Sequence, residues 1–163
     1  MAKQKEEKTN VMRILEQKGI PYTPHTYEHE EGVAVDGVTV ARSLGQDPEC
    51  VFKTLVARGA SKSIYVFCIP VAENLDLKKA ARSVGEKSME MIHVKEINAL
   101  TGYVRGGCSP VGMKKEYPTV FHETAEIVDT IMVSAGKIGY QVELAPQALM
   151  ELVGVKLADI TVV

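Results

Sequence analysis

The chain has 163 residues, of which 45% are hydrophobic and 25% charged, and we expect residues 1–163 to form one domain with a substantial core. Its net charge of -2 excludes a strongly basic nucleic-acid-binding surface, so any nucleic-acid contact must depend on a local patch. No apolar run is long enough to span a membrane, and the charged N-terminus lacks the apolar region of a secretory signal.

The first predicted elements are a helix, an edge strand and a second helix. Thr9 or Asn10 is suited to cap a helix, and Gly19-Ile20-Pro21 ends it. Residues 22–27 are predicted as a strand, and Pro24 favours an edge position because proline donates no ladder hydrogen bond. A polar, acidic loop over residues 28–37 then leads to a short helix over residues 38–44.

A β-hairpin is predicted next, from apolar runs at 51–57 and 63–70 that flank a polar turn. Helices follow at 75–84 and 95–100, and short strands near Val120, at 131–133 and at 140–144. Pro146 is suited to the first turn of a helix that reaches Leu152, and residues 160–163 are predicted as a last strand. Because strands and helices alternate irregularly, we predict an α+β fold, with a mixed, largely antiparallel sheet flanked by helices.

Lys53 is a cation within an apolar strand. Strand alternation places it on the same face as Val51 and Leu55. An unpaired ammonium is costly to bury, so a lysine in this position indicates either a functional site or a side chain that extends to water from an edge strand. The residues alone leave both interpretations open.

Two glycine-rich turns each carry a hydroxyl group. Gly106-Gly107-Cys108-Ser109 has glycines that permit close backbone approach, and its N–H groups are suited to stabilise a carbonyl oxygen. Residues 134–139 form either an anion-binding turn or an ordinary hairpin connection, and they lack the full spacing of a phosphate-binding P-loop. Together with Lys53, the turns predict a pocket for a small polar ligand with a carbonyl or phosphate.

The cysteines and histidines form no convincing catalytic or metal-binding pattern. Three cysteines without metal or disulfide spacing are typical of a reducing cytoplasm, where we expect the protein to lie. Cys108 has no histidine near it in sequence, and we interpret it as a buried side chain rather than a nucleophile. His25 and His29 straddle the end of a predicted strand, which argues against a metal site there. We expect no metal and no organic cofactor.

The motifs taken together resemble the YbaK family of aminoacyl-tRNA deacylases, which are related to the editing domain of bacterial prolyl-tRNA synthetases. The resemblance covers nearly the whole chain. Its motifs occur in the family's order, at Pro21–Tyr27, 51–55, 74–81, 102–112, 133–139 and 143–146.

The resemblance implies roles for individual residues. Lys53 is implied as the catalytic residue, which holds the amino-acid end or the terminal adenosine phosphate. The implied substrate-binding residues are Tyr27, Thr54, Gly106, Gly107, Ser109, Ser134 and Gly136. Asp36 stands where relatives carry an aromatic residue, so the resemblance does not carry over the pocket wall there or, with it, the choice of substrate.

The resemblance further implies hydrolysis of mischarged cysteinyl-tRNA(Pro), with cysteinyl-tRNA(Cys) as a further candidate substrate. The thiol of the substrate itself is the implied nucleophile. The alternatives are an alanyl-tRNA(Pro) deacylase, a non-catalytic module that binds tRNA or a synthetase, and an esterase for a small metabolite. The implied partners are mischarged tRNA(Pro) and, in a ternary complex, prolyl-tRNA synthetase.

Overall fold

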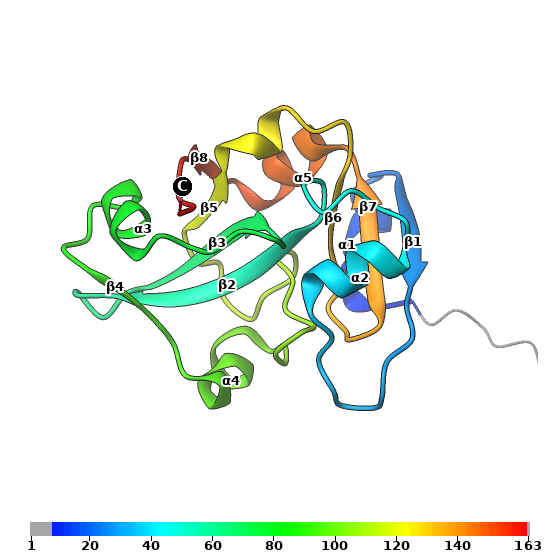
Figure 1. Cartoon of the computed structure of the whole chain (residues 1–163), viewed down its shortest axis with the longest axis horizontal. Coiled ribbons are helices and arrows are strands. Elements are labelled where there is room, and N and C mark those ends of the chain that lie inside the picture. Colours follow the sequence, from blue (N-terminus) through cyan, green and yellow to red (C-terminus); the bar gives the residue numbers. More distant parts are fainter. Residues whose placement is uncertain (1–7, 163) are drawn as a thin grey trace, which may run out of the picture.

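The computed structural model describes residues 8–162, which form an α+β fold as predicted (Figure 1). The helices are α1 (Asn10–Gln17), α2 (Gly37–Ser43), α3 (Leu77–Ser83), α4 (Ile97–Thr101) and α5 (Pro146–Val153), with 3-10 turns η1 (Val94–Glu96) and η2 (Glu123–Glu126). The strands are β1 (Tyr22–Thr26), β2 (Phe52–Gly59), β3 (Ile64–Pro70), β4 (Met89–Met91), β5 (Thr119–His122), β6 (Ile131–Ser134), β7 (Tyr140–Leu144) and β8 (Lys156–Ala158).

The strands form two sheets. One is antiparallel, in the order β1-β7-β6, and the other is mixed, in the order β4-β2-β3-β5-β8. The β5 strand pairs in parallel with both β3 and β8, whereas β2 pairs antiparallel with β3 and β4. The predicted mixed, largely antiparallel arrangement is therefore confirmed, and its division into two sheets is an addition. Among residues 8–162, one isolated bridge, between Val51 and Met132, links the two sheets.

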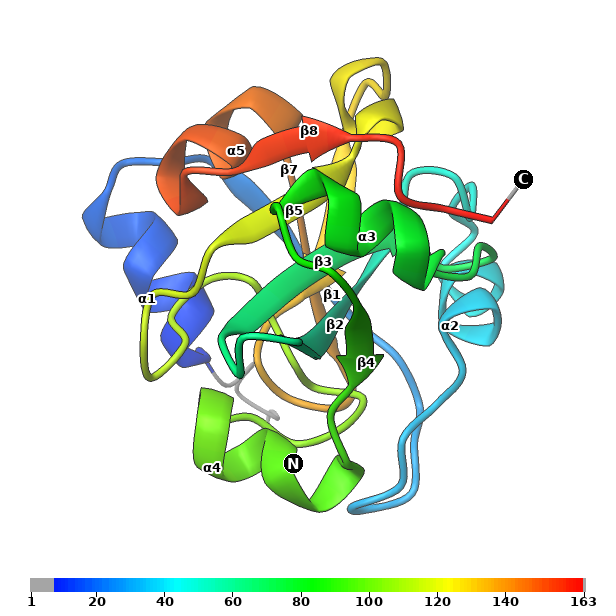
Figure 2. The same cartoon turned by 90° about the vertical axis from the view of Figure 1, so that its left-hand side faces the viewer.

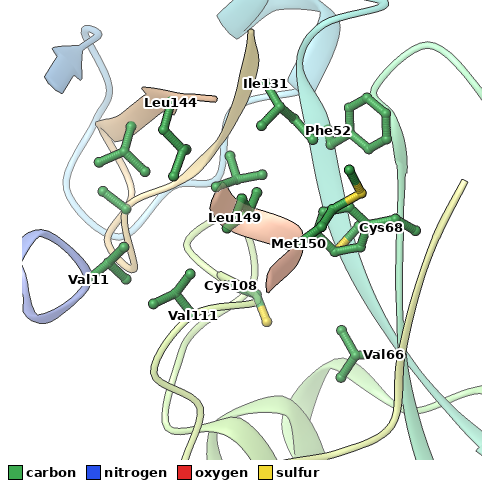
Figure 3. Packing of buried hydrophobic residues seen from close by; sticks show 14 of the residues in the cluster. Val11, Phe52, Val66, Cys68, Cys108, Val111, Ile131, Leu144, Leu149 and Met150 are labelled. Carbon is green, nitrogen blue, oxygen red and sulfur yellow. The ribbon is translucent and has the colours of Figure 1, made fainter. Parts of the chain in front are cut away.

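The two sheets share one hydrophobic core. Figure 3 shows Leu149 and Met150 of α5 between Ile131 and Leu144 of the antiparallel sheet and Phe52 of the mixed sheet. On the opposite face of the mixed sheet, α3 packs through Ala80 and Ala81, and α2 packs at the junction of the sheets. The junction is thus held by apolar contacts from both of its sides, which stabilises the relative placement of the sheets.

The β2 strand has an open edge near Lys53. It pairs along its length with β3, but β4 pairs only with Ala57–Gly59. Within residues 8–162, no strand therefore pairs with residues 53–55 on the side of β2 where β4 pairs farther along. An unpaired strand edge leaves backbone groups and side chains accessible to a ligand.

Several element predictions are confirmed and two details are wrong. Thr9 caps α1, β1 lies at a sheet edge, and 52–70 forms the expected hairpin. The last strand is Lys156–Ala158 rather than 160–163; Thr161 forms an isolated bridge with Leu75, and Val163 lies outside the described residues. The short strand β4 was not expected. Over residues 8–162, none of the helices has the length and apolar character needed to cross a membrane.

Candidate active site

A cleft of about 1300 Å³ opens beside the free edge of β2. The loop over residues 32–36 forms one wall and the segment from Met91 to Asn98 another, while residues 104–108 and strands β6 and β7 complete the lining. Figures 1 and 2 both show the loop before α2 and the α4 segment at the same end of the molecule. Segments that are far apart in the sequence therefore meet at one cavity.

Lys53 lies in this cleft, as predicted from its position in an apolar strand. Its side chain is half-buried, and it has no hydrogen bond or ion pair to any other residue in the 8–162 range. Burial lowers the pKa of Lys53, whereas the negative charges of Asp36 and Glu73 act to raise it. A partly desolvated cation without a direct protein partner is suited to bind an anionic or carbonyl oxygen.

Asp36 lines the same cleft as Lys53 and caps helix α2. Its Oδ2 atom accepts hydrogen bonds from the Thr39 N–H at 3.1 Å and from the Thr39 hydroxyl at 2.8 Å. These two bonds chiefly lower the pKa of Asp36, and the Lys53 charge lowers it further. The carboxylate is therefore ionised at neutral pH.

The two glycine-rich turns pack directly against each other. Gly107 lies so close to the other turn that a Cβ atom here would be 3.0 Å from the Ile138 nitrogen. Gly106 has φ +85° and lines the cleft, and a Cβ here would lie 2.6 Å from the Ala34 Cβ. The turns were predicted to form one pocket with Lys53, and the structure brings Gly106 and Ser134 to the same cleft as Lys53.

The structure separates the predicted substrate-binding residues into two groups. Those that line the cleft are Tyr27, Thr54, Gly106 and Ser134. Gly107, Ser109 and Gly136 lie behind the lining: the Ser109 hydroxyl is fully buried and accepts a hydrogen bond from the Val111 N–H. The Gly107 N–H donates to the Val104 carbonyl at 2.9 Å, so it is not available for a substrate carbonyl as expected.

Other N–H groups of the first turn remain candidates for a carbonyl oxygen. Gly106 and Cys108 line the cleft, and neither N–H donates a hydrogen bond to a protein acceptor in the described part of the chain. Ser134 accepts the Gly136 N–H at 3.1 Å, which leaves its hydroxyl proton available to a ligand. Of the N–H groups predicted for a carbonyl site, those of Gly106 and Cys108 therefore stay candidates, whereas that of Gly107 does not.

The thiols and imidazoles of the chain are poorly placed for nucleophilic attack. Burial raises the pKa of Cys108 to about 11 and that of Cys68 to about 12, so both are protonated at neutral pH. Among the described residues that line the cleft there is no histidine. His25 instead hydrogen-bonds Glu143 at 2.8 Å. Residues 8–162 contain no group of three or more His, Cys, Asp or Glu side chains able to hold a metal ion.

Sequence reasoning missed several lining residues. Gln141 is buried in the cleft wall, and its Oε1 atom has no hydrogen-bond partner among residues 8–162. Lys95 and Arg105 are exposed lining residues. Near them lie exposed apolar side chains that also line the cleft, namely Met91, Val94 and Val104. Val104 and Arg105 fall within the 102–112 motif, but nothing in the local pattern predicts that these residues meet, because their proximity arises only from the tertiary fold.

Residues 32–152 match the aminoacyl-tRNA editing domain family, a segment that contains nearly the whole cleft. The chain belongs to this family. Membership confirms the resemblance predicted from the motifs. A protein of Enterococcus faecalis, named as a candidate Cys-tRNA(Pro)/Cys-tRNA(Cys) deacylase, EbsC, is 46% identical to this editing domain over 162 residues, which cover 99% of this chain and 98% of the relative.

Solved structures share the fold of this editing domain. A crystal structure described as a candidate trans-editing enzyme for prolyl tRNA synthetase has a TM-score of 0.79 and 24% identity, covering 94% of this chain and 95% of the other. A scaffold protein used in computational epitope backbone grafting also has a TM-score of 0.79, with 25% identity over the same shares of the two chains. The arrangement of two sheets is therefore shared with these solved structures.

Proposed function

We propose that this editing domain is a hydrolase that deacylates mischarged Cys-tRNA(Pro), with Cys-tRNA(Cys) as a second substrate. The observation that carries the proposal is the 46% identity, over almost the full length of both chains, to a relative named for these two activities. The cleft beside Lys53 supports the proposal, because a cation and N–H donors line one cavity of about 1300 Å³.

The proposed role of the cleft is to position an ester that is already reactive. Lys53 binds the terminal phosphate or the amino-acid end, and the N–H groups of Gly106 and Cys108 face the ester carbonyl. Stabilising the negative charge that develops on that oxygen accelerates acyl transfer by about 100-fold or more per donor in comparable sites. Positioning adds to this effect, because a bound ester has lost its translational freedom.

The proposed nucleophile is the thiol of the substrate's cysteine. Its sulfur attacks the ester carbonyl carbon, the bond from that carbon to the ribose oxygen breaks, and the ribose oxygen takes up the thiol proton. The products are a small cyclic thioester and deacylated tRNA. The raised pKa of Cys108, at about 11, supports a substrate thiol over a protein thiol as the attacking group.

The proposed tRNA partner is bound through local cations rather than through the net charge of -2. Lys95 and Arg105 lie at the cleft and are exposed, where phosphates of the acceptor end are able to reach them. A weak intrinsic affinity for tRNA favours a ternary complex with prolyl-tRNA synthetase, which would supply the remaining binding energy.

The test is deacylation of Cys-tRNA(Pro) and Ala-tRNA(Pro) in parallel by wild type, Lys53→Ala and Lys78→Ala. Lys78 is an exposed lysine on α3, outside the cleft, and serves as the matched control. We expect the wild type to deacylate Cys-tRNA(Pro) but not Ala-tRNA(Pro). Lys53→Ala should abolish this activity, and Lys78→Ala should leave it unchanged. Deacylation of Ala-tRNA(Pro) instead would identify alanyl-tRNA(Pro) as the substrate and would require water as the nucleophile. Cleavage of neither ester would refute the proposed function.

A further inference from the structure

The charged side chains of the cleft are unequally distributed. Among the described lining residues, Asp36 is the one acidic side chain, whereas three cations line the same space: Lys53, Lys95 and Arg105. The other polar lining groups described above are the N–H donors of Gly106 and Cys108, the Ser134 hydroxyl, and Gln141, whose Oε1 atom is an uncharged acceptor. A ligand bound here meets many donors and a single carboxylate.

The end of an aminoacyl-tRNA has the complementary charges. Its phosphates are anionic and its ester carbonyl is an acceptor, so both match the cations and N–H groups. Its α-ammonium is a cation with three N–H donors, and a donor-rich, positively charged cleft would repel it. Burying such a group without an acceptor is costly, so an oxygen of the protein must meet it.

Asp36 has an oxygen available for this purpose. Both hydrogen bonds from Thr39 end on Oδ2, and the Val38 N–H interacts more weakly with the same carboxylate. A carboxylate has about four acceptor sites, so capacity remains for a ligand. The carboxylate is exposed, and the N-terminus of α2 fixes its place at the cleft wall. An ionised, fixed acceptor is suited to orient an ammonium, because charge-assisted hydrogen bonds are the strong ones.

We propose that Asp36 binds the α-ammonium group of the aminoacyl ester and thereby selects substrates whose α-amino group is unmodified and charged. This inference rests on the deacylase function proposed above. The ammonium, held at Asp36, orients the ester carbonyl toward the N–H groups of the glycine-rich turn. Asp36 is therefore a specificity-determining residue, and an aromatic side chain at this position would not supply the same contact.

The test uses Asp36→Asn, which removes the charge but keeps the helix cap, because asparagine and aspartate cap helices about equally well. Each protein is assayed with Cys-tRNA(Pro) and with its α-hydroxy analogue, in which a hydroxyl replaces the ammonium. The assay is run at pH about 6.5, below the usual α-amino pKa of about 7.7. Asp76→Asn is the matched control, since Asp76 caps α3 with hydrogen bonds to two backbone N–H groups and does not line the cleft.

We expect wild type to prefer the amino substrate in kcat/KM by roughly tenfold, the order expected for a hydrogen bond to a charged group. Asp36→Asn should lose this preference and keep its activity on the α-hydroxy analogue, and Asp76→Asn should keep the preference. Equal losses on both substrates, or an unchanged preference in Asp36→Asn, would overturn the inference while leaving the proposed function intact. A wild type inactive on both substrates would overturn both.

Discussion

Gly106 connects the glycine-rich turn to the loop that forms the opposite wall of the cleft. Its φ of +85° favours glycine, and a Cβ here would meet the Ala34 Cβ at 2.6 Å and the Ala34 Cα at 3.1 Å. Gly106→Ala should therefore displace the loop wall and lower deacylation of Cys-tRNA(Pro) at least tenfold, an order typical of misplaced active-site groups.

Gly45→Ala separates this effect from backbone strain. Gly45 has φ +65°, but nothing lies within 4 Å of a Cβ built there, and it does not line the cleft. Both variants should lose about 1–2 kcal/mol of stability from the left-handed conformation, as measured by urea unfolding. Only Gly106→Ala should lose deacylation. Parallel losses of activity in the two variants would show that strain, not the wall, is responsible.

Cys108 lines the cleft, but its thiol is buried, unlike that of a catalytic cysteine. Because burial raises its pKa to about 11, almost none of it is thiolate at pH 7. Cys108→Ser should therefore leave the deacylation rate largely unchanged, measured with the wild type under single-turnover conditions. A folded Cys108→Ser protein without activity would instead restore the protein-thiol mechanism.

At the scale of elements, Glu143 holds the three strands of the antiparallel sheet together. It lies on the central strand β7, where one carboxylate oxygen accepts from the Thr130 hydroxyl at 2.7 Å, just before β6, and the other hydrogen-bonds His25 of β1 at 2.8 Å. The pKa of Glu143 is lowered, first by the hydrogen bond from Thr130 and then by that of His25, although burial acts in the opposite direction.

A lowered carboxyl pKa predicts the sign of a pH effect on stability. The stabilisation is fully present above the unfolded-state value, near 4.5, and is lost as the pH falls through the lower folded-state value. Glu143→Gln should thus cost on the order of 1 kcal/mol at pH 7 and progressively less below pH 4.5. Urea unfolding of both proteins across this range measures the difference. A difference that stays constant with pH would contradict the prediction.

The elements also show what a sequence can reveal. The hairpin 52–70 and helix α5 were predictable, because apolar, β-branched runs around a polar turn and a proline in the first turn are local signals. Strand β4 was not, because it has three residues of which only Met89 is buried, too few for a pattern. The parallel pairing of β8 depends on β5, far away in sequence. Lys53 was found because a lysine is unusual in an apolar strand, whereas Lys95 and Gln141 are unremarkable in their own segments.

At the scale of the whole molecule, the charge that matters for tRNA is local. The chain has a net charge of -2, yet the described residues lining the cleft include three cations and one carboxylate. Attraction between these cations and phosphates releases bound counterions, so the affinity should fall as the salt concentration rises. Replacing the exposed cations Lys95 and Arg105 should consequently weaken binding of the tRNA body more than it affects the ester chemistry at Lys53.

The double variant Lys95→Glu with Arg105→Glu tests whether the exposed cations of the cleft bind tRNA phosphates. It should raise KM for Cys-tRNA(Pro) and reduce the slope of log kcat/KM against log salt by about one for each lost phosphate contact. Cleavage of a cysteinyl ester of adenosine, which lacks the tRNA body, should change little. The control is Lys78→Glu with Arg82→Glu, which makes the same charge change on exposed residues of α3. Equal effects of the two double variants would mean that net charge, rather than the cations at the cleft, determines the encounter with tRNA.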